Sequence, residues 1–114
     1  MPICYEDHDS GVRLIRISGR MDIPGTTEID AKFAILASSG QHWVVVDLTE
    51  VSFLASIGIR SLISNAKAQQ HRGGKFVLVV GTNEGVRKTL ETTGIDSLIP
   101  MFADLAAAES AVRA

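Results

Sequence analysis

Apolar residues follow two patterns along this chain, one typical of strands and the other typical of amphipathic helices. Short runs rich in β-branched residues predict strands at Val12–Ser18, His42–Leu48 and Lys75–Gly81. The second and third runs are apolar almost throughout and do not alternate with polar residues. We therefore expect both to be covered on both faces, as strands of a parallel sheet are.

Longer stretches between these runs have the periodicity of amphipathic helices. The stretch from Pro24 to Gly40 has one apolar face, and Thr26 or Thr27 is suitably placed to cap it; that face consists of Ile29, Phe33, Leu36 and Ala37. A second helix is expected from Ser56 to the Gly73-Gly74 pair, with a buried stripe of Ile59, Leu62, Ile63 and Ala66. Two shorter helices are expected after the caps Asn83 and Asp104.

The remaining segments complete the sheet. Cys4 and Tyr5 are expected on a short strand that turns through DHDSG to pair with Val12–Ser18, and Ile99–Phe102 is expected at an edge because Pro100 lacks a backbone donor. Strands that alternate with helices require parallel crossover connections. The prediction is an α/β fold, a mixed sheet of four to five strands packed with four helices, forming a single domain over residues 1–114.

The composition of the chain argues against several classes of function. The 114 residues carry a formal net charge of −2 and few aromatic side chains, which argues against nucleic-acid binding. No apolar run is long enough to cross a bilayer, and the first residues lack the pattern of a signal peptide, so we expect a cytoplasmic protein. The scattered His8, His42 and His71 have no metal-site spacing, and the single Cys4 cannot form an internal disulfide. We expect neither metal nor cofactor.

Functional groups of such sheets tend to lie at the carboxyl ends of the strands. Here those ends fall within Gly19–Gly25, Leu48–Gly58 and Gly81–Gly85. Ser56 lies at one of them, and two interpretations of it are open. It caps the second helix, or its hydroxyl is displayed to another protein.

The residues after Ser56 favour the second interpretation, in which the hydroxyl is exposed to another protein. Ile57 falls almost opposite the buried stripe, so we expect it to be exposed, and an apolar side chain beside a hydroxyl suggests a docking surface. Gly58 lets a neighbouring or partner backbone approach closely. Arg60 falls on the same side of the helix as Ser56, one turn further on.

Three segments resemble the STAS domain of the bacterial anti-sigma factor antagonists. The central one, VVVDLTEVSFLASIGIRSLI at positions 44–63, is similar to that family's strand, Asp-Leu, aromatic and Asp-Ser-(Ser/Thr)-Gly pattern. SGRMDIPGTTEI at 18–29 resembles its turn before the first helix, and positions 72–104 resemble the remainder. Two positions depart from the pattern: Ala55 replaces the aspartate before the serine, and Ile57 replaces the second hydroxyl residue.

The resemblance implies partner switching. Proteins of this kind bind an anti-sigma factor with a GHKL-type serine kinase domain while unphosphorylated, and are released after phosphorylation; a PP2C-type phosphatase reverses the modification. By position, the phosphoacceptor is Ser56, and Asp22 is the turn aspartate associated with the kinase interface. We expect a non-catalytic module whose partner surface consists of Asp22, Ile23, Ser56, Ile57, Gly58, Arg60, Asn83 and Glu84.

Three alternatives remain open. The chain could be a STAS scaffold, or a module regulating a transporter or complex, without a phosphorylation cycle. It could be a response-regulator receiver with Asp47 as acceptor, but the required acidic pair and lysine are not placed after their strands, so Asp47 is interpreted as a capping or turn residue. An enzyme is disfavoured because Ser56 lacks a G-x-S-x-G elbow and GTNEG at 81–85 is a plain turn.

Overall fold

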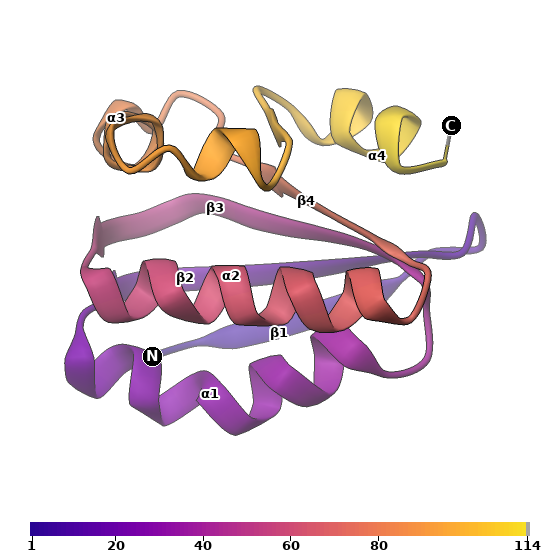
Figure 1. Cartoon of the computed structure of the whole chain (residues 1–114), viewed down its shortest axis with the longest axis horizontal. Coiled ribbons are helices and arrows are strands. Elements are labelled where there is room, and N and C mark those ends of the chain that lie inside the picture. Colours follow the sequence, from indigo (N-terminus) through magenta and orange to yellow (C-terminus); the bar gives the residue numbers. More distant parts are fainter. Residues whose placement is uncertain (114) are drawn as a thin grey trace.

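A five-stranded mixed sheet lies at the centre of the computed structural model, which describes residues 1–113 (Figure 1). The strand order follows the chain, and the strands are β1 (Ile3–Asp7), β2 (Val12–Met21), β3 (Trp43–Leu54), β4 (Lys75–Val79) and β5 (Met101–Phe102). β1 is antiparallel to β2, and all other neighbours are parallel. The predicted mixed sheet and its opening hairpin are confirmed.

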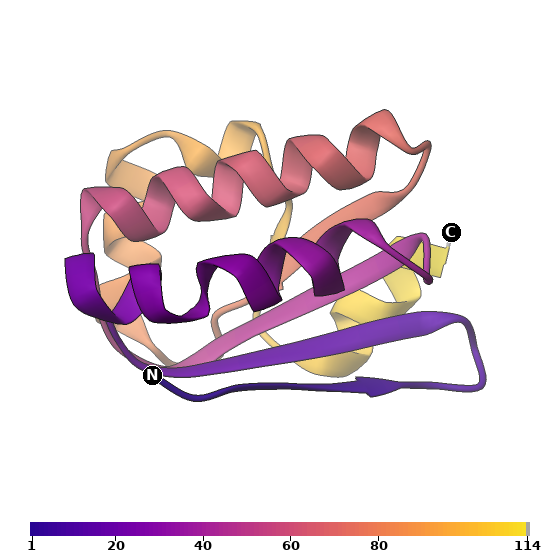
Figure 2. The same cartoon turned by 90° about the horizontal axis from the view of Figure 1, so that it is seen from below.

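Helices cover both faces of this sheet: α1 (Ile23–Ser38), α2 (Ser56–His71), α3 (Glu84–Thr92) and α4 (Leu105–Arg113), with a short 3-10 turn, η1, at Ile95–Ser97. α1 and α2 run side by side on one face, and α4 lies on the other (Figures 1 and 2). The larger core lies between the sheet and α1, α2 and α3, and a smaller one lies under α4. None of the helices in residues 1–113 is long and apolar enough to span a membrane.

The predicted core positions of the two long helices are largely confirmed. All four apolar positions expected to face inward from α1 are buried. In α2, Leu62 and Ala66 are buried, and Ile59 and Ile63 are partly buried against the same core. Each helix therefore packs on the sheet along the stripe that its periodicity indicated.

β3 is longer than predicted, because the strand continues past Leu48 to Leu54. The Oδ1 atom of Asp47 accepts a hydrogen bond from the backbone N–H of Thr49 at 2.9 Å, and the pairing with β2 shifts register at this point. The interpretation of Asp47 as a capping or turn residue is wrong, because Asp47 lies within β3 and pairs with Arg16 of β2 and Val79 of β4. The strand runs through this irregularity without a break and pairs with β2 again from Glu50 onward.

Several element ends differ from the prediction. The N-cap of α1 is Asp22, not Thr26 or Thr27, because the helix begins at Ile23 and Thr26 is buried within it. β4 ends at Val79, and the last strand comprises only Met101–Phe102. The predicted caps Asn83 and Asp104 are confirmed, since their Oδ1 atoms accept hydrogen bonds from the third following backbone N–H at 3.3 Å and 2.8 Å.

Candidate functional site

The carboxyl ends of β2 and β3 lie side by side, and each strand leads directly into a helix. The backbone N–H of Ala55 donates to the carbonyl oxygen of Met21 at 3.0 Å, which joins the two strand ends. α1 and α2 consequently begin at the same end of the molecule (left in Figure 2). This places the first residues of the two helices, Ile23 and Ser56, on one edge of the domain.

Asp22 organises the first of these helix starts. Its Oδ1 accepts from the backbone N–H of Gly25 at 2.9 Å, and its Oδ2 accepts from Nε of Arg20 at 3.2 Å. The Gly25 hydrogen bond, with help from Arg20, holds the pKa of the Asp22 carboxyl below its usual value. A Cβ on Gly25 would lie 2.1 Å from the carbonyl oxygen of Arg20, so only glycine fits this turn. Asp22 is therefore ionised, and its side chain is held in place as the N-cap of α1.

Ser56 is exposed and is the first residue of α2. The N-cap is Ala55, whose methyl group cannot accept a hydrogen bond, so the interpretation of Ser56 as the cap is wrong. Among the described residues, none forms a hydrogen bond with the Ser56 hydroxyl, and none is a base positioned to activate it. The geometry thus presents a free hydroxyl that another protein can reach, rather than an activated nucleophile.

The two residues after Ser56 face inward more than predicted. Gly58 is buried, and a Cβ there would lie 2.8 Å from Cδ1 of Leu54 and 2.9 Å from Cβ of Met21. Its missing side chain lets α2 approach the strand ends, so the close neighbour lies within this chain. Ile57, expected to be exposed, is half-buried because α1 packs beside α2 and shelters it.

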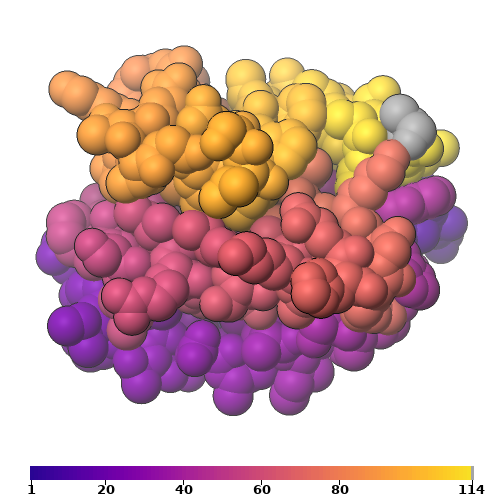
Figure 3. Space-filling view, viewed as in Figure 1, coloured from indigo at the N-terminus to yellow at the C-terminus, as the bar shows by residue number. Residues whose placement is uncertain are grey.

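A groove with a cavity volume of about 290 Å³ separates α1 from α2 next to Ser56. In Figure 3, the two helices form neighbouring bands across this side of the molecule. Arg60 is exposed at the groove and has no hydrogen bond or ion pair with any residue of the described chain. Asp30, on the α1 side, accepts from the Ser61 hydroxyl at 3.4 Å. The other lining residues are Thr26, Thr27, Ala34, Ile57, Ser64 and Asn65.

Two large apolar side chains are exposed at the strand ends. Ile23 is 69% exposed, and Phe53 is 42% exposed with the Arg20 guanidinium carbon 4.5 Å from its ring centroid. The sequence interpretation included Ile23 but missed Phe53, because β3 was expected to end at Leu48. The available signal was the renewed strand-like run Val51–Leu54, whose first and last residues are buried.

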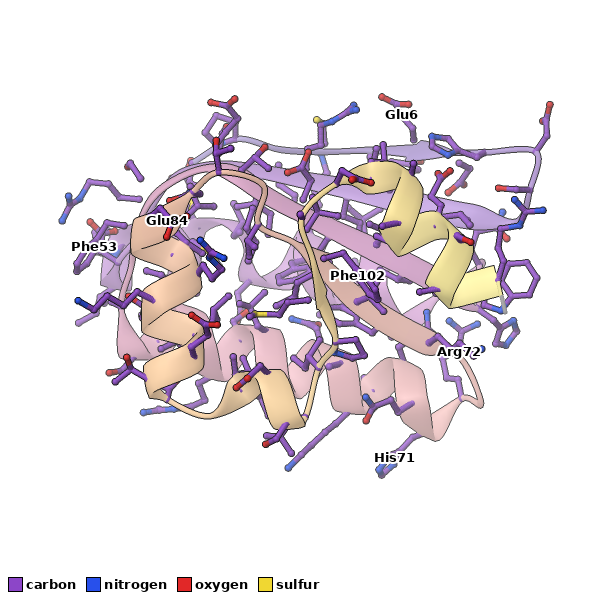
Figure 4. The ribbon with its side chains drawn as sticks, turned by 90° about the horizontal axis from the view of Figure 1, so that it is seen from above. Glu6, Phe53, His71, Arg72, Glu84 and Phe102 are labelled. Carbon is purple, nitrogen blue, oxygen red and sulfur yellow. The ribbon has the colours of Figure 1, made fainter. Side chains whose placement is uncertain are left out.

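The start of α3 lies at the same end of the molecule; Figure 4 shows Glu84 and Phe53 there. The side-chain amide of Asn83 donates to the carbonyl oxygens of Val51 at 2.6 Å and Leu48 at 3.2 Å, which fastens α3 to β3. Glu84 is exposed and pairs with Arg87. Asn83 thus has a structural role, and Glu84 lies at the surface as a rim residue would.

The remaining chemistry-bearing residues do not gather around Ser56. His8 contacts Glu109 and Glu6 between β1 and α4, away from the carboxyl ends of the parallel strands. Within residues 1–113, no three His, Cys, Asp or Glu side chains are grouped as metal ligands would be. The site consists of one free hydroxyl, an exposed aromatic, an unpaired arginine and a carboxylate that caps a helix.

Comparison with known proteins agrees with this architecture. The sequence model of the STAS domain family matches residues 6–108. The chain is 26% identical over 111 residues to the anti-sigma-F factor antagonist RsfB of Mycobacterium tuberculosis, covering 97% of this chain and 88% of that protein. It is 25% identical over 107 residues to the putative anti-sigma factor antagonist BtrV of Bordetella bronchiseptica, covering 94% and 91%.

A solved structure gives the same result. The crystal structure of an anti-sigma factor antagonist from Mycobacterium paratuberculosis superposes with a TM-score of 0.89 at 27% identity, covering 99% of this chain and 94% of that one. The family match spans most of the chain, and the structural match includes all the elements that form the site. This chain belongs to the STAS domain family.

Proposed function

We propose that this protein is an anti-sigma factor antagonist that acts by partner switching in the cytoplasm. In its unphosphorylated form it binds an anti-sigma factor with a GHKL-type serine kinase domain, and phosphorylation of Ser56 releases it. The observation that carries the proposal is the exposed, unbonded hydroxyl of Ser56 at the start of α2, beside the strand ends. The similarity to named anti-sigma factor antagonists supports it.

The reactions of this cycle are supplied by the partners. The kinase transfers the γ-phosphoryl group of ATP to Oγ of Ser56; the hydroxyl proton passes to a base on the kinase, and ADP leaves. A PP2C-type phosphatase hydrolyses the phosphoserine and releases inorganic phosphate. This chain contributes a reachable hydroxyl and a docking surface, and we propose that it is not an enzyme.

Phosphorylation should change binding without unfolding the domain. The first backbone N–H groups of α2 have no side-chain cap, and the positive end of the helix dipole favours an anion at this position. In a complex, however, a charge of about −1.5 to −2 would enter an interface suited to a neutral hydroxyl. A mismatched buried charge costs about 2–5 kcal/mol, which corresponds to a loss of affinity of about 30- to 5000-fold.

The proposed partner surface surrounds Ser56. It keeps the exposed and half-buried residues of the sequence interpretation, omits the buried Gly58 and gains Phe53. Its members are Asp22, Ile23, Phe53, Ser56, Ile57, Arg60, Asn83 and Glu84.

The test is to incubate the protein with its cognate ATP-binding anti-sigma partner and ATP, and to locate the phosphate by mass spectrometry. We expect one phosphate on Ser56, and none on a Ser56→Ala variant. Phosphate on another residue, or none at all, would refute the assignment.

A second function is favoured by one residue. Ala55 stands where the pattern that this chain resembles has an aspartate before the serine, and this departure supports a STAS scaffold that binds its partner without a phosphorylation cycle. In that case the partner would bind this surface with equal affinity whether or not ATP is present, and Ser56 would stay unmodified.

A further inference from the structure

We propose that Arg60 is the residue that holds the phosphate of phosphorylated Ser56. This inference rests on the proposed function, because it concerns the modified form of the same site. It assigns to Arg60 a role in regulation, as the side chain that registers the phosphorylation state and changes its own position in response.

The helix places the two side chains next to each other. Ser56 is the first residue of α2 and Arg60 is one turn further on, and side chains four residues apart on a helix have Cβ atoms about 5–6 Å apart. Long side chains of a helix point back towards its amino end. An extended Arg60 side chain therefore leans towards the position that a phosphate on Ser56 would occupy, without any change in the backbone.

Arg60 is also available, unlike the other arginines near this end of the sheet. Arg20 is engaged by Asp22 and by the ring of Phe53, and Arg87 is paired with Glu84. Among residues 1–113, nothing forms a hydrogen bond or ion pair with Arg60, and its side chain is exposed. Recruiting it breaks no existing bond of the described structure, so its attraction to the phosphate is not offset by a lost partner.

The groove contains another anionic group that could attract Arg60. Arg60 lines it together with Asp30, whose carboxylate can carry one charge at most, and no ion pair joins these two residues in the described part of the chain. A phosphate carries about −1.5 to −2 charges and accepts two parallel N–H bonds from a guanidinium. The phosphate is thus the stronger anion within reach. When Arg60 turns to it, the groove loses its cation while Asp30 remains, so a single modification changes the charge of two neighbouring parts of the surface.

The experiment measures the phosphate directly and needs no kinase. Phosphoserine is installed at position 56 during translation, and its second pKa, about 6 for a free phosphoserine, is measured by ³¹P NMR as a function of pH. The comparison is between the otherwise unchanged chain, Arg60→Gln and Lys67→Gln. Lys67 is an exposed cation further along the same helix, so its substitution removes the same charge at a distance. The helix end acts equally on the phosphate in all three proteins.

We expect the second pKa to be lower in the unchanged chain than in Arg60→Gln by about half a unit to one unit, because a nearby cation favours the dianion. Lys67→Gln should leave it unchanged. Equal values in the unchanged chain and Arg60→Gln would overturn the inference, as would an equal rise in both variants. If no kinase modifies Ser56, the proposed function fails while this measurement stands, so the two failures are distinguishable.

Discussion

The guanidinium of Arg20 lies over the ring of Phe53, with 4.5 Å between the guanidinium carbon and the ring centroid. The two residues are paired across β2 and β3, and Arg20 also donates to Asp22. One arginine therefore connects an exposed aromatic side chain to the carboxylate that caps α1. The contact favours one orientation of Phe53, which precedes Ser56 by three residues, and a preordered aromatic side chain loses little entropy when a partner covers it.

The aromatic ring is expected to contribute to partner binding. Phe53→Ala should weaken binding of the cognate anti-sigma partner by about tenfold or more, as truncation of a central aromatic residue commonly does. Isothermal titration calorimetry measures the dissociation constant. Tyr5→Ala is the matched control, because Tyr5 is 48% exposed and also lies under an arginine, Arg13, but on β1. A similar loss of affinity in both variants would show that the effect is not local to this surface.

Charge at position 56 is expected to act as the switch. Ser56→Asp should lower affinity for the partner by about 30-fold or more, because it brings a charge into an interface suited to a neutral hydroxyl, whereas Ser56→Ala should bind as the unmodified protein does. Because Ser56 caps nothing, neither variant should lose much stability, which thermal unfolding can verify. Equal affinities of the two variants would rule out charge at this residue as the release signal.

Gly58 is expected to be intolerant of any side chain. In Gly58→Ala the new methyl group would lie 2.8 Å from Cδ1 of Leu54 and 3.0 Å from the carbonyl oxygen of Met21. Overpacking of this kind costs about 1–3 kcal/mol, more than the gain of about 1 kcal/mol that alanine brings to a helix. Urea denaturation should show a net loss of stability. Gly85→Ala in α3, where the nearest atom would be 4.0 Å away, should instead stabilise; a loss of equal size there would contradict the packing argument.

A capping side chain at position 55 is expected to stabilise α2. The backbone of Ala55 has φ −89° and ψ 172°, the extended conformation of an N-cap, but its side chain cannot bond the free N–H groups of α2. Ala55→Asp should raise the free energy of unfolding by about 0.5–2 kcal/mol. Ala55→Leu, which is apolar and cannot cap, should not. An unchanged midpoint of urea denaturation in Ala55→Asp would mean that the N–H groups are already satisfied.

His8 is expected to make stability depend on pH. Its ring bonds Glu109 on α4 and Glu6 on β1, and these hydrogen bonds, Glu109 first, raise the pKa of His8 above its usual value. Because the folded pKa lies above the unfolded value of about 6.5, the stabilisation is fully present below that pH. It is lost as the pH rises through the folded pKa.

The free energy of unfolding should therefore differ more between the unchanged protein and His8→Gln at about pH 5.5 than at about pH 8.5. Urea denaturation at both pH values measures this difference. His42→Gln, an exposed histidine before β3, is the control and should show no such trend. A difference for His8→Gln that stays constant between the two pH values would contradict the role of the His8–Glu109 contact.

Local patterns were sufficient for the architecture. Strand-forming runs and helical periodicity are properties of residues close together in the chain. The sequence alone therefore determined the order of elements, the mixed sheet and most of the core, including Ile29, Phe33, Leu62 and Ala66. The caps Asn83 and Asp104 were readable for the same reason, since a cap acts on the third residue after it. The family resemblance, carried by contiguous motifs, indicated Ser56 as the candidate phosphoacceptor.

Only the tertiary structure decided what surrounds that serine. β3 continues beyond Leu48 because β2 continues to pair with it, and no local pattern contains that pairing. Ile57 is sheltered because α1 lies beside α2, and Arg60 and Asp30 meet at one groove although they belong to different helices. Which side chains share a surface depends on contacts between segments distant in the sequence, so the exposed hydroxyl was predictable, whereas the shelter of Ile57, the groove and the exposed ring of Phe53 were not.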